Sequence, residues 1–549
     1  MSAEPSKKTN PNGVGMSRRQ FVQMSGAFVA AGIAAPSLST VAESLGAHPA
    51  QRPSTRYNLI FIMTDEERFP QYWPKGWVDQ NLPNRKRLAD HGLTFNRAFC
   101  SSAMCSPSRA TFFTGLYPDQ HGVKYTLQTG VDWIGQPTLQ TSTQNMARML
   151  ASAGYDVQYR GKWHMSKDPS GLQHVQSQTD LARYGFNGWM PPDSGTDDQP
   201  EHFGGGCTSY DTQYADQVAA FLRGVDPWST KPFALFLMFA NPHDIMSYPS
   251  CWDEVSASDL EEFEGCDNYG SSAPDCFKQG IELPPTVDEK LLENYKPVVQ
   301  SEFKVLLDAM SGPVDKPIEM LNYVNFYAYL HKVVDKHIGT VLDALHSKHG
   351  LSEKTLVIRL ADHGEMGLSH GLREKVFNAY EETIHVPMVI SNPTLFPKPV
   401  QTEALVSLID VMPTLAKLVD VPKRGEWDFK GVDLTPIIQD AIENPDNPTA
   451  TVQESILFAT DETSKYLHEP MHIRCLREEN WKFAMYFDPE GKVDPEYELY
   501  DLSNDPTEYY NMANPLSLFY NPAKVEEMYN KLRLKMEETG TTPPKMKAS

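Results

Sequence analysis

Four short, predominantly apolar segments, each followed closely by polar residues, constrain the fold of this chain more than any other feature. They are the segments 58–63, 155–159, 233–239 and 355–361. Predominantly apolar segments of this length are typical of strands that are buried on both faces of a parallel sheet. Helical patterns alternate with these runs, and the clearest extends from Glu319 to His349, just before the helix-ending residue Gly350.

Alternating strands and helices predict an α/β fold, in which a doubly wound, mostly parallel sheet is flanked by helices. Ligands of such sheets bind beyond the carboxyl ends of the strands. The polar residues that follow the four apolar runs should therefore meet at one place. They are Asp65 and Glu66, Lys162 and His164, His243, and Asp362 and His363.

Three parts can be distinguished along the sequence. Residues 1–50 form a leader, residues 55–430 hold the α/β domain, and residues 431–549 show short strand patterns and then a helical pattern from about Pro522 to Glu538. We expect this last part to form a smaller subdomain with an antiparallel sheet and a closing helix. Residues 244–318, within the α/β domain, are rich in Asp, Glu, Gly, Pro and Cys and read as an irregular loop insertion near the strand ends.

The leader contains the pair Arg18-Arg19, followed by the apolar, small-residue run from Gly26 to Ala35. This order resembles a Tat-type export signal. The apolar run is too short to span a bilayer, and no later segment reaches that length, so we expect no stable membrane anchor. These features predict export of the folded protein by the Tat machinery, and a periplasmic or secreted location.

The chain has a formal net charge of −22 at pH 7. An acidic protein repels nucleic acid and anionic membrane surfaces, so neither is an expected partner. It also repels small anions. A site for an anionic substrate would therefore need local positive charge from a metal ion and a few Lys, Arg and His residues.

The segment around Cys105 carries the most specific signal in the chain. Cys105-Ser-Pro-Ser-Arg109 is followed by Ala110-Thr111, Thr114-Gly115 and His121-Gly122. This pattern resembles the signature of the type I, formylglycine-dependent sulfatases of the alkaline-phosphatase-like superfamily. The resemblance extends from about residue 55 to residue 540, and it implies that a formylglycine-generating enzyme oxidises Cys105 to formylglycine.

The resemblance also implies the reaction. The hydrate of formylglycine carries two hydroxyl groups on one carbon. One attacks the sulfur of a sulfate monoester and displaces the alcohol, and the other then collapses the covalent sulfo-enzyme intermediate and releases sulfate. The expected enzyme is a sulfuric-ester hydrolase of the arylsulfatase type. Its substrate would be an aryl, alkyl or sugar sulfate, selected by loops around residues 165–210, 244–318 and 460–475.

Matching motifs of the family imply roles for several further residues. Arg109 would hold the hydrate in place. Lys162 and His164, in the segment Gly-Lys-Trp-His, would bind the sulfate and the hydrate. His243, in Asn-Pro-His-Asp, would protonate the leaving oxygen.

The second sulfate-binding lysine of the family corresponds best to Lys375. This residue lies in Gly-Leu-Arg-Glu-Lys before Tyr380-Glu381, one residue farther from that pair than in many relatives. Arg373 is the lesser candidate for the same role.

Adjacent carboxylates directly after an apolar strand are costly unless a cation or hydrogen-bond donors satisfy them. Asp65 and Glu66 stand in that position, and Asp362 with His363 does so as well. Carboxylate oxygens with one ring nitrogen suit Ca²⁺, and also Mg²⁺ or Mn²⁺. The resemblance implies a calcium ion held by these four residues and the modified Cys105. Two positions depart from the family pattern, since Glu66 replaces the commoner Asp and His363 replaces the commoner Asn.

Two other functions remain open on the sequence. Phosphonate monoester and phosphate diester hydrolases of the same fold share the formylglycine, and an Asp-His metal pair occurs among them. A protein whose Cys105 is never converted would instead bind sulfate esters without cleaving them. The presence of Lys162, His164 and His243 together favours an enzyme over that last alternative.

Overall fold

The computed structural model describes residues 56–127, 138–167, 175, 177–194, 210–248, 276–543 and 545. The predicted Tat-type leader, residues 1–50, lies outside these ranges, as does the stretch 249–275 of the predicted insertion. Among the helices of the described ranges, none is long and apolar enough to cross a membrane.

The larger of the two sheets has eight strands. They are β1 (Asn58–Asp65), β2 (Gly92–Phe99), β3 (Asp156–Gly161), β4 (Phe233–Pro242), β5 (Thr355–Ala361), β6 (His385–Ser391), β7 (Val400–Thr402) and β8 (Val406–Ser407). Their order is β3-β4-β1-β5-β6-β2-β7, with β8 paired to β2. β6 runs antiparallel to β5 and β2, while the other described pairings are parallel. The predicted mostly parallel sheet is confirmed.

The four apolar runs form the adjacent strands β3, β4, β1 and β5. Every residue of β4 and β5 is buried, which explains why these segments do not alternate between polar and apolar residues. β1 and β5 pair in register, from Asn58 opposite Thr355 to Thr64 opposite Ala361. The residues that follow these two strands therefore leave the sheet side by side.

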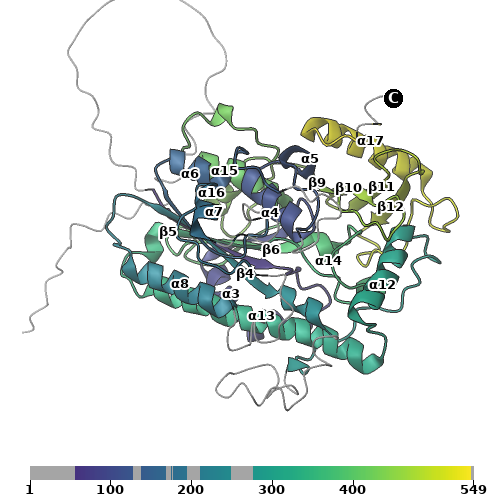
Figure 1. Ribbon diagram of the computed structural model, residues 1–549, viewed down its shortest axis with the longest axis horizontal. Helices are drawn as coiled ribbons and strands as arrows, with labels where there is room; N and C mark the ends of the chain where they lie inside the picture. Colours follow the sequence, from purple (N-terminus) through teal and green to yellow (C-terminus); the bar gives the residue numbers. More distant parts are fainter. Residues whose placement is uncertain are drawn as a thin grey trace, which may run out of the picture.

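Helices cover both faces of this sheet (Figure 1). On one face α3 (Pro83–Asp90), α8 (Tyr210–Gly224) and α13 (Pro317–His346) pack with Ile60 and Ile62 of β1.

The other face is covered by four helices that pack with Leu59 and Phe61 of the same strand. They are α4 (Cys105–Thr114), α6 (Met146–Ser152), α15 (Val411–Leu418) and α16 (Thr435–Glu443). Successive residues of a strand point to opposite faces, so one apolar run supplies both cores.

Several shorter elements connect these layers. The α-helices are α2 (Trp77–Asn81), α5 (Pro118–His121), α7 (Gln178–Ala182), α12 (Val298–Ser311) and α14 (Glu381–Ile384). The 3₁₀ turns are η2 (His243–Ser247), η3 (Ser352–Lys354), η4 (Ser369–Gly371), η5 (Leu408–Asp410) and η6 (Arg424–Glu426).

Two helices differ from the sequence prediction. α13 ends at His346, three residues early, where the Ser347 hydroxyl donates to the carbonyl of Ala344 at 2.7 Å. α12 is a helix of 14 residues inside the segment 244–318, which the sequence predicts to be irregular. Its buried residues are Val299 and Gln300, both near its start. Val299, Phe303 and Leu306 recur at three- and four-residue steps and pack against the core, so the segment carries a helical pattern that the interpretation of it as irregular overlooked.

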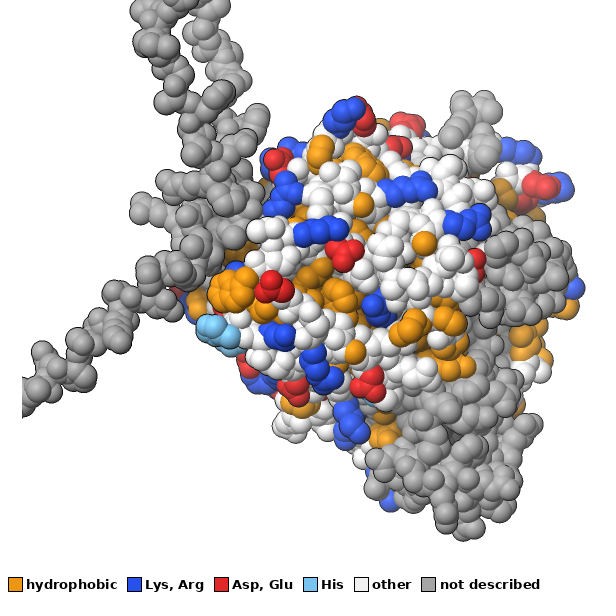
Figure 2. All heavy atoms as spheres, turned by 60° about the vertical axis from the view of Figure 1, so that its left-hand side comes forward, with side chains coloured by type: hydrophobic (Ala, Val, Ile, Leu, Met, Phe, Trp, Pro, Cys, Tyr) orange, Lys and Arg blue, Asp and Glu red, His pale blue; other side chains and the backbone are white. Residues whose placement is uncertain are grey.

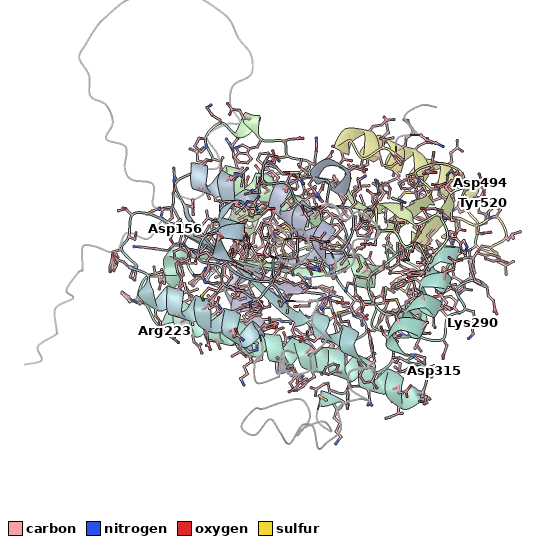
Figure 3. The ribbon with its side chains drawn as sticks, in the orientation of Figure 1. Asp156, Arg223, Lys290, Asp315, Asp494 and Tyr520 are labelled. Atoms are coloured by element: carbon pink, nitrogen blue, oxygen red, sulfur yellow. The ribbon has the colours of Figure 1, made fainter. Side chains whose placement is uncertain are left out.

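The C-terminal part forms the predicted antiparallel sheet, in the order β12-β11-β10-β9. Its strands are β9 (Ser455–Thr460), β10 (His472–Glu478), β11 (Trp481–Phe487) and β12 (Glu496–Asp501). Helix α17 (Pro522–Thr539) buries Met528, Leu532 and Met536 against this sheet. Asp494 and Tyr520 mark this end of the molecule in Figure 3, and Asp156 and Arg223 mark the opposite end.

The molecular surface shown in Figure 2 carries Lys, Arg, Asp and Glu side chains interspersed with apolar ones. The net charge of −22 is therefore not gathered into one acidic field on this face. Mixed charges of this kind are ordinary for a protein surface.

Candidate active site

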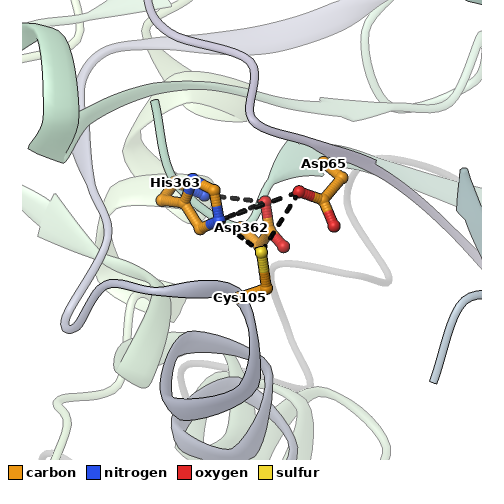
Figure 4. Close-up of side chains that lie close together, drawn as sticks. All are labelled: Asp65, Cys105, Asp362 and His363. Carbon is orange, nitrogen blue, oxygen red and sulfur yellow. Dashed lines mark hydrogen bonds and ion pairs between the residues drawn. The ribbon is translucent and has the colours of Figure 1, made fainter. Parts of the chain in front are cut away.

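Residues that follow two neighbouring strands meet beside Cys105. Asp65 ends β1, and Asp362 and His363 follow β5. Cys105 is the first residue of α4 and is 1% exposed. Its Sγ lies 3.2 Å from Nε2 of His363 and 3.6 Å from Oδ1 of Asp65 (Figure 4). The side chains at these strand ends thus converge as expected.

Arg109, one turn along α4 from Cys105, joins the two aspartates. Its guanidinium donates to Oδ2 of Asp65 at 2.8 Å, to Oδ2 of Asp362 at 2.9 Å and to the carbonyl of Lys162 at 3.0 Å. The planar fork of an arginine suits such bridging. The Oδ1 atoms of both aspartates lie on the other side, each 3.7 Å from Nε2 of His363.

Lys162 reaches the same aspartate from the end of β3. Its Nζ lies 2.5 Å from Oδ2 of Asp65, and both side chains are fully buried. The backbone before it requires glycine, because Gly161 has a φ of 97° and a Cβ there would lie 1.9 Å from the carbonyl oxygen of Met238. Strands β3 and β4 approach closely at this point, and Lys162 leaves the sheet toward Asp65.

His164 is a buried neighbour of Cys105. Its Nε2 is 2.7 Å from the carbonyl oxygen of Leu127, and its interaction with Cys105 helps to lower the pKa of that thiol. Asp193 accepts hydrogen bonds from the backbone N–H of Trp163, at 2.6 Å, and of His164. This carboxylate therefore fixes the backbone that carries Lys162 and His164.

His243 and Lys375 approach Glu66, the residue after Asp65. His243 follows β4, and its Nε2 lies 3.9 Å from Oε2 of Glu66. Nζ of Lys375 is 2.7 Å from the same oxygen and 2.8 Å from Oε2 of Glu374. All ten residues that the sequence analysis selected therefore belong to one buried cluster, which the charge of Cys105 links electrostatically to Glu66, His243 and Lys375.

Comparisons with known proteins agree with this geometry. A family model described as Sulfatase matches residues 57–421, more than half of the 549 residues. The chain belongs to the sulfatase family. A second model, described as N-sulphoglucosamine sulphohydrolase, C-terminal, matches residues 368–541 of this sulfatase.

One curated relative is an N-acetylglucosamine-6-O-sulfatase of Bacteroides thetaiotaomicron, 24% identical over 528 residues, which cover 90% of this chain and 88% of the relative. Two solved structures have a TM-score of 0.61 and 20% identity, and therefore show the shared fold. One is a protein in complex with its substrate D-glucosamine-2-N,6-O-disulfate, covering 89% of this chain and 99% of that one. The other is the phosphonate monoester hydrolase of Agrobacterium radiobacter, with coverages of 88% and 96%.

The charges around Cys105 of the sulfatase favour a negative group at this position. Burial alone raises the pKa of the thiol, but Lys162, Lys375 and His363 outweigh it and hold that pKa well below its usual value. Burial and the charge of Lys162 lower the pKa of His243 to about 4. An anion that entered the site would therefore meet two buried ammonium groups.

A cation fits between the two aspartates, His363 and Cys105. Ligand atoms of Asp65, Cys105, Asp362 and His363 all lie within 4.8 Å of one another, and all four residues are buried. Nδ1 of His363 lies 3.0 Å from the carbonyl oxygen of Gly364, which can only accept, so a neutral ring turns the lone pair of Nε2 toward the cluster. Two carboxylates and one imidazole suit Ca²⁺, Mg²⁺ or Mn²⁺.

Two pKa shifts are consistent with an excess of negative charge in this candidate metal-ligating set. Burial and the neighbouring Asp65 raise the pKa of Asp362 to about 6. Burial lowers the pKa of His363, but Asp362 and Cys105 raise it to about 9. Both groups thus attract protons, and a divalent cation would neutralise the same excess.

Glu66 stands apart from this set. Its carboxylate contacts Lys375 and forms a second potential ligand group with Asp65 and His243. Its Oε1 is buried and has no hydrogen-bond partner among the described residues. The role of Glu66 as a metal ligand stays a prediction, and so do the individual roles of the other site residues.

Sequence reasoning missed Glu374 and Asp193, and it left Arg373 as an alternative to Lys375. The one sequence signal for Glu374 is that it directly precedes Lys375. Asp193 lies in an irregular segment with no motif around it. Arg373 turns away from the cluster and donates to Asp308 at 2.9 Å and to the carbonyl of Gly312 at 2.8 Å, so Lys375 is the better candidate.

Proposed function

We propose that this sulfatase hydrolyses sulfate monoesters and uses a formylglycine formed from Cys105. The observation that carries the proposal is the cluster of buried cations, Arg109, Lys162 and Lys375, around one buried side chain at the start of a helix. A chain with a net charge of −22 attracts a sulfate ester only through such a local positive site. Helix amides at the start of α4 add to that field.

Each residue has a task that its contacts support. Lys162 and Lys375 bind sulfate oxygens and neutralise the charge that they gain as the ester bond breaks. Arg109 holds Asp65 and Asp362 in fixed orientations. When Cys105 is converted, its hydrated aldehyde supplies two hydroxyl groups, one for attack on sulfur and one whose deprotonation expels sulfate.

A divalent cation belongs to the same proposal. Asp65, Asp362 and His363 would hold it, with Glu66 as the further ligand that the family pattern implies. When bound, the cation would act as a Lewis acid on oxygen atoms at position 105 and on sulfate. Ca²⁺ is the ion we propose, and Mg²⁺ and Mn²⁺ suit the same ligands.

His243 is the proposed proton donor to the leaving oxygen, and His164 the residue that hydrogen-bonds the nucleophile. The pKa of His243, about 4, results from burial and from the charge of Lys162. A bound ester brings a negative charge beside both residues, which favours the protonated ring. His243 would then protonate the departing alcohol from within the complex.

We propose a sulfated saccharide as the substrate class. The N-acetylglucosamine-6-O-sulfatase and the protein bound to D-glucosamine-2-N,6-O-disulfate support this choice. Aryl and alkyl sulfates are the other candidates. We also propose that a formylglycine-generating enzyme modifies the chain, and that Arg18-Arg19 directs it through the Tat machinery to the periplasm or the medium.

The test is co-expression with a formylglycine-generating enzyme, followed by mass spectrometry of the peptide that contains Cys105. We expect the aldehyde at this position and hydrolysis of sulfated saccharides by the ion-loaded protein. The matched variant Cys105→Ala should fold and bind sulfate without turnover. An intact thiol together with full activity would refute the formylglycine mechanism.

A second candidate function is hydrolysis of phosphonate monoesters or phosphate diesters. It is favoured by the Asp362-His363 pair beside Cys105 and by the fold shared with a phosphonate monoester hydrolase. Specificity constants for matched nitrophenyl sulfate, phosphonate monoester and phosphodiester substrates separate the two functions. A larger value for a phosphorus substrate would reverse the assignment.

A further inference from the structure

Lys375 is held between two carboxylates. Its Nζ lies 2.7 Å from Oε2 of Glu66 and 2.8 Å from Oε2 of Glu374. Two acidic side chains thus face one ammonium group, whose side chain is 2% exposed. A sulfate oxygen that approaches this lysine meets a cation whose charge is already engaged, and it also meets the charge of the carboxylates.

The two carboxylates are anchored differently. The backbone N–H of Glu66 donates to Oδ1 of Asp362 at 3.1 Å, its carbonyl accepts from the Tyr327 hydroxyl at 2.6 Å, and its side chain is fully buried. The side chain of Glu374 is 12% exposed. Among the described residues, Lys375 is the hydrogen-bond partner that its carboxylate has. Glu374 is therefore the partner that can move away.

The backbone at Glu374 also points to a specific role. Its φ is 67°, in the left-handed region that non-glycine residues seldom adopt. Such a conformation persists where the surroundings hold it, and it is common at functional sites. Here it turns the carboxylate back onto the neighbouring Lys375. The charges of His243 and Cys105 act on this carboxylate, so it lies beside the position where sulfur would react.

We infer that Glu374 weakens the binding of free sulfate at Lys375 and so promotes release of this product. The inference rests on the proposed function, in which Lys375 binds sulfate. A sulfate monoester carries one negative charge, whereas inorganic sulfate carries two at neutral pH. The repulsion from Glu374 is proportional to that charge, so it acts about twice as strongly on the product as on the substrate.

This difference predicts a ratio that an experiment can measure. If removal of the charge at Glu374 strengthens sulfate binding about tenfold, which is about 1.4 kcal/mol, it should lower the KM of a monoester only about threefold. The reason is that doubling an energy squares the factor in the binding constant. If Glu374 had a purely structural role, its replacement would instead weaken the binding of sulfate and of the monoester together.

The experiment uses the converted, ion-loaded enzyme and inorganic sulfate as a competitive inhibitor of a sulfate monoester that the enzyme hydrolyses. The test variants are Glu374→Gln and Glu374→Asn, because asparagine tolerates the left-handed backbone. Glu365→Gln is the matched control. Its carboxylate is buried in the same loop, but its hydrogen bonds come from the Tyr323 hydroxyl at 2.5 Å and the Gly367 N–H at 3.0 Å rather than from Lys375.

We expect both Glu374 variants to lower the inhibition constant of sulfate about tenfold, with the smaller change in KM, while Glu365→Gln leaves the constant within twofold. Unchanged constants, equal changes in both constants, or the same gain in Glu365→Gln would overturn the inference. Loss of folding in both Glu374 variants would assign the contact a bracing role and overturn it too. Calorimetric titration with inorganic sulfate measures how much each Glu374 variant changes the sulfate affinity, and it needs no turnover. If no sulfate ester is hydrolysed, the proposed function alone is refuted, and this titration still tests the inference.

Discussion

Replacement of Arg109 by lysine tests whether one side chain organises the whole site. Arg109 donates to Asp65, to Asp362 and to the carbonyl of Lys162, and all of its surroundings are buried. Lysine keeps the charge, but its compact head group cannot bridge two carboxylates. A buried carboxylate that loses its partner costs about 3–5 kcal/mol, and the lost bond to the carbonyl adds about 1 kcal/mol. The free energy of unfolding should fall by about 4–6 kcal/mol.

The effect on function follows from the same contacts. Arg109 sets the orientation of the two aspartates that we propose as metal ligands, and loss of such a partner typically weakens metal binding about 10–100-fold. We expect kcat/KM to fall by about 10³ or more, since about 4 kcal/mol of transition-state stabilisation corresponds to that factor. Denaturant unfolding, metal titration and steady-state kinetics measure the three quantities.

Arg373→Lys is the control for this prediction. Arg373 is also buried, but its carboxylate partner, Asp308, is 34% exposed, so water replaces the lost contacts. We expect this variant to lose about 1 kcal/mol and to keep its metal affinity. If Arg109→Lys were no less stable than Arg373→Lys and bound metal equally well, the bridging role of Arg109 would be refuted.

Three further predictions concern backbone, pH and metal. Gly161→Ala should destabilise the protein by about 3 kcal/mol or more in thermal unfolding, because its Cβ would lie 1.9 Å from the carbonyl oxygen of Met238. Gly122→Ala, with a φ of 83° but open space around it, should cost only about 1 kcal/mol, and equal losses would contradict the steric argument. Burial lowers the pKa of His121 to about 3, so the unfolded chain takes up a proton first and stability is lost as the pH falls below about 6.5. Between pH 7.5 and pH 5, the free energy of unfolding of His121→Gln should therefore fall by about 2 kcal/mol less than that of the unchanged protein. Parallel curves of unfolding free energy against pH would count against this. Chelation of divalent ions should abolish turnover and lower the melting temperature, with recovery on adding Ca²⁺; a chelator-resistant enzyme would exclude the proposed metal role.

Much of the fold could be predicted because buried strands consist mostly of apolar residues. The segment 355–361 is apolar apart from Thr355 and Arg359, since every residue of β5 is buried, and it was predicted with its observed bounds. α12 was missed because the Asp, Glu, Gly, Pro and Cys content of residues 244–318 as a whole outweighed the helical spacing of Val299, Phe303 and Leu306. The sequence also carries no sign that β1 and β5 are neighbours. Only the paired strands explain why Asp65 and Asp362 meet.

The residues of the candidate site also fall into those that the sequence predicts and those that it does not. Residues in recognisable motifs, such as Cys105 and Lys162, could be selected in advance. Asp193 could not, because it acts by accepting two backbone hydrogen bonds, and any segment that reaches this point could supply such an acceptor. The hydrogen bond from Lys375 to Glu66 could not be predicted either, because it joins residues that lie 309 positions apart in the sequence.

Helix α4 has a consequence for the order of events in the life of the protein. All ten of its residues, from Cys105 to Thr114, are buried. A second enzyme needs an exposed stretch of chain to reach one side chain, and the finished molecule offers none at this point. The proposed oxidation of Cys105 must therefore come before folding. Molecules that fold first would keep an unconverted Cys105, so the active fraction would depend on the rate of modification relative to the rate of folding.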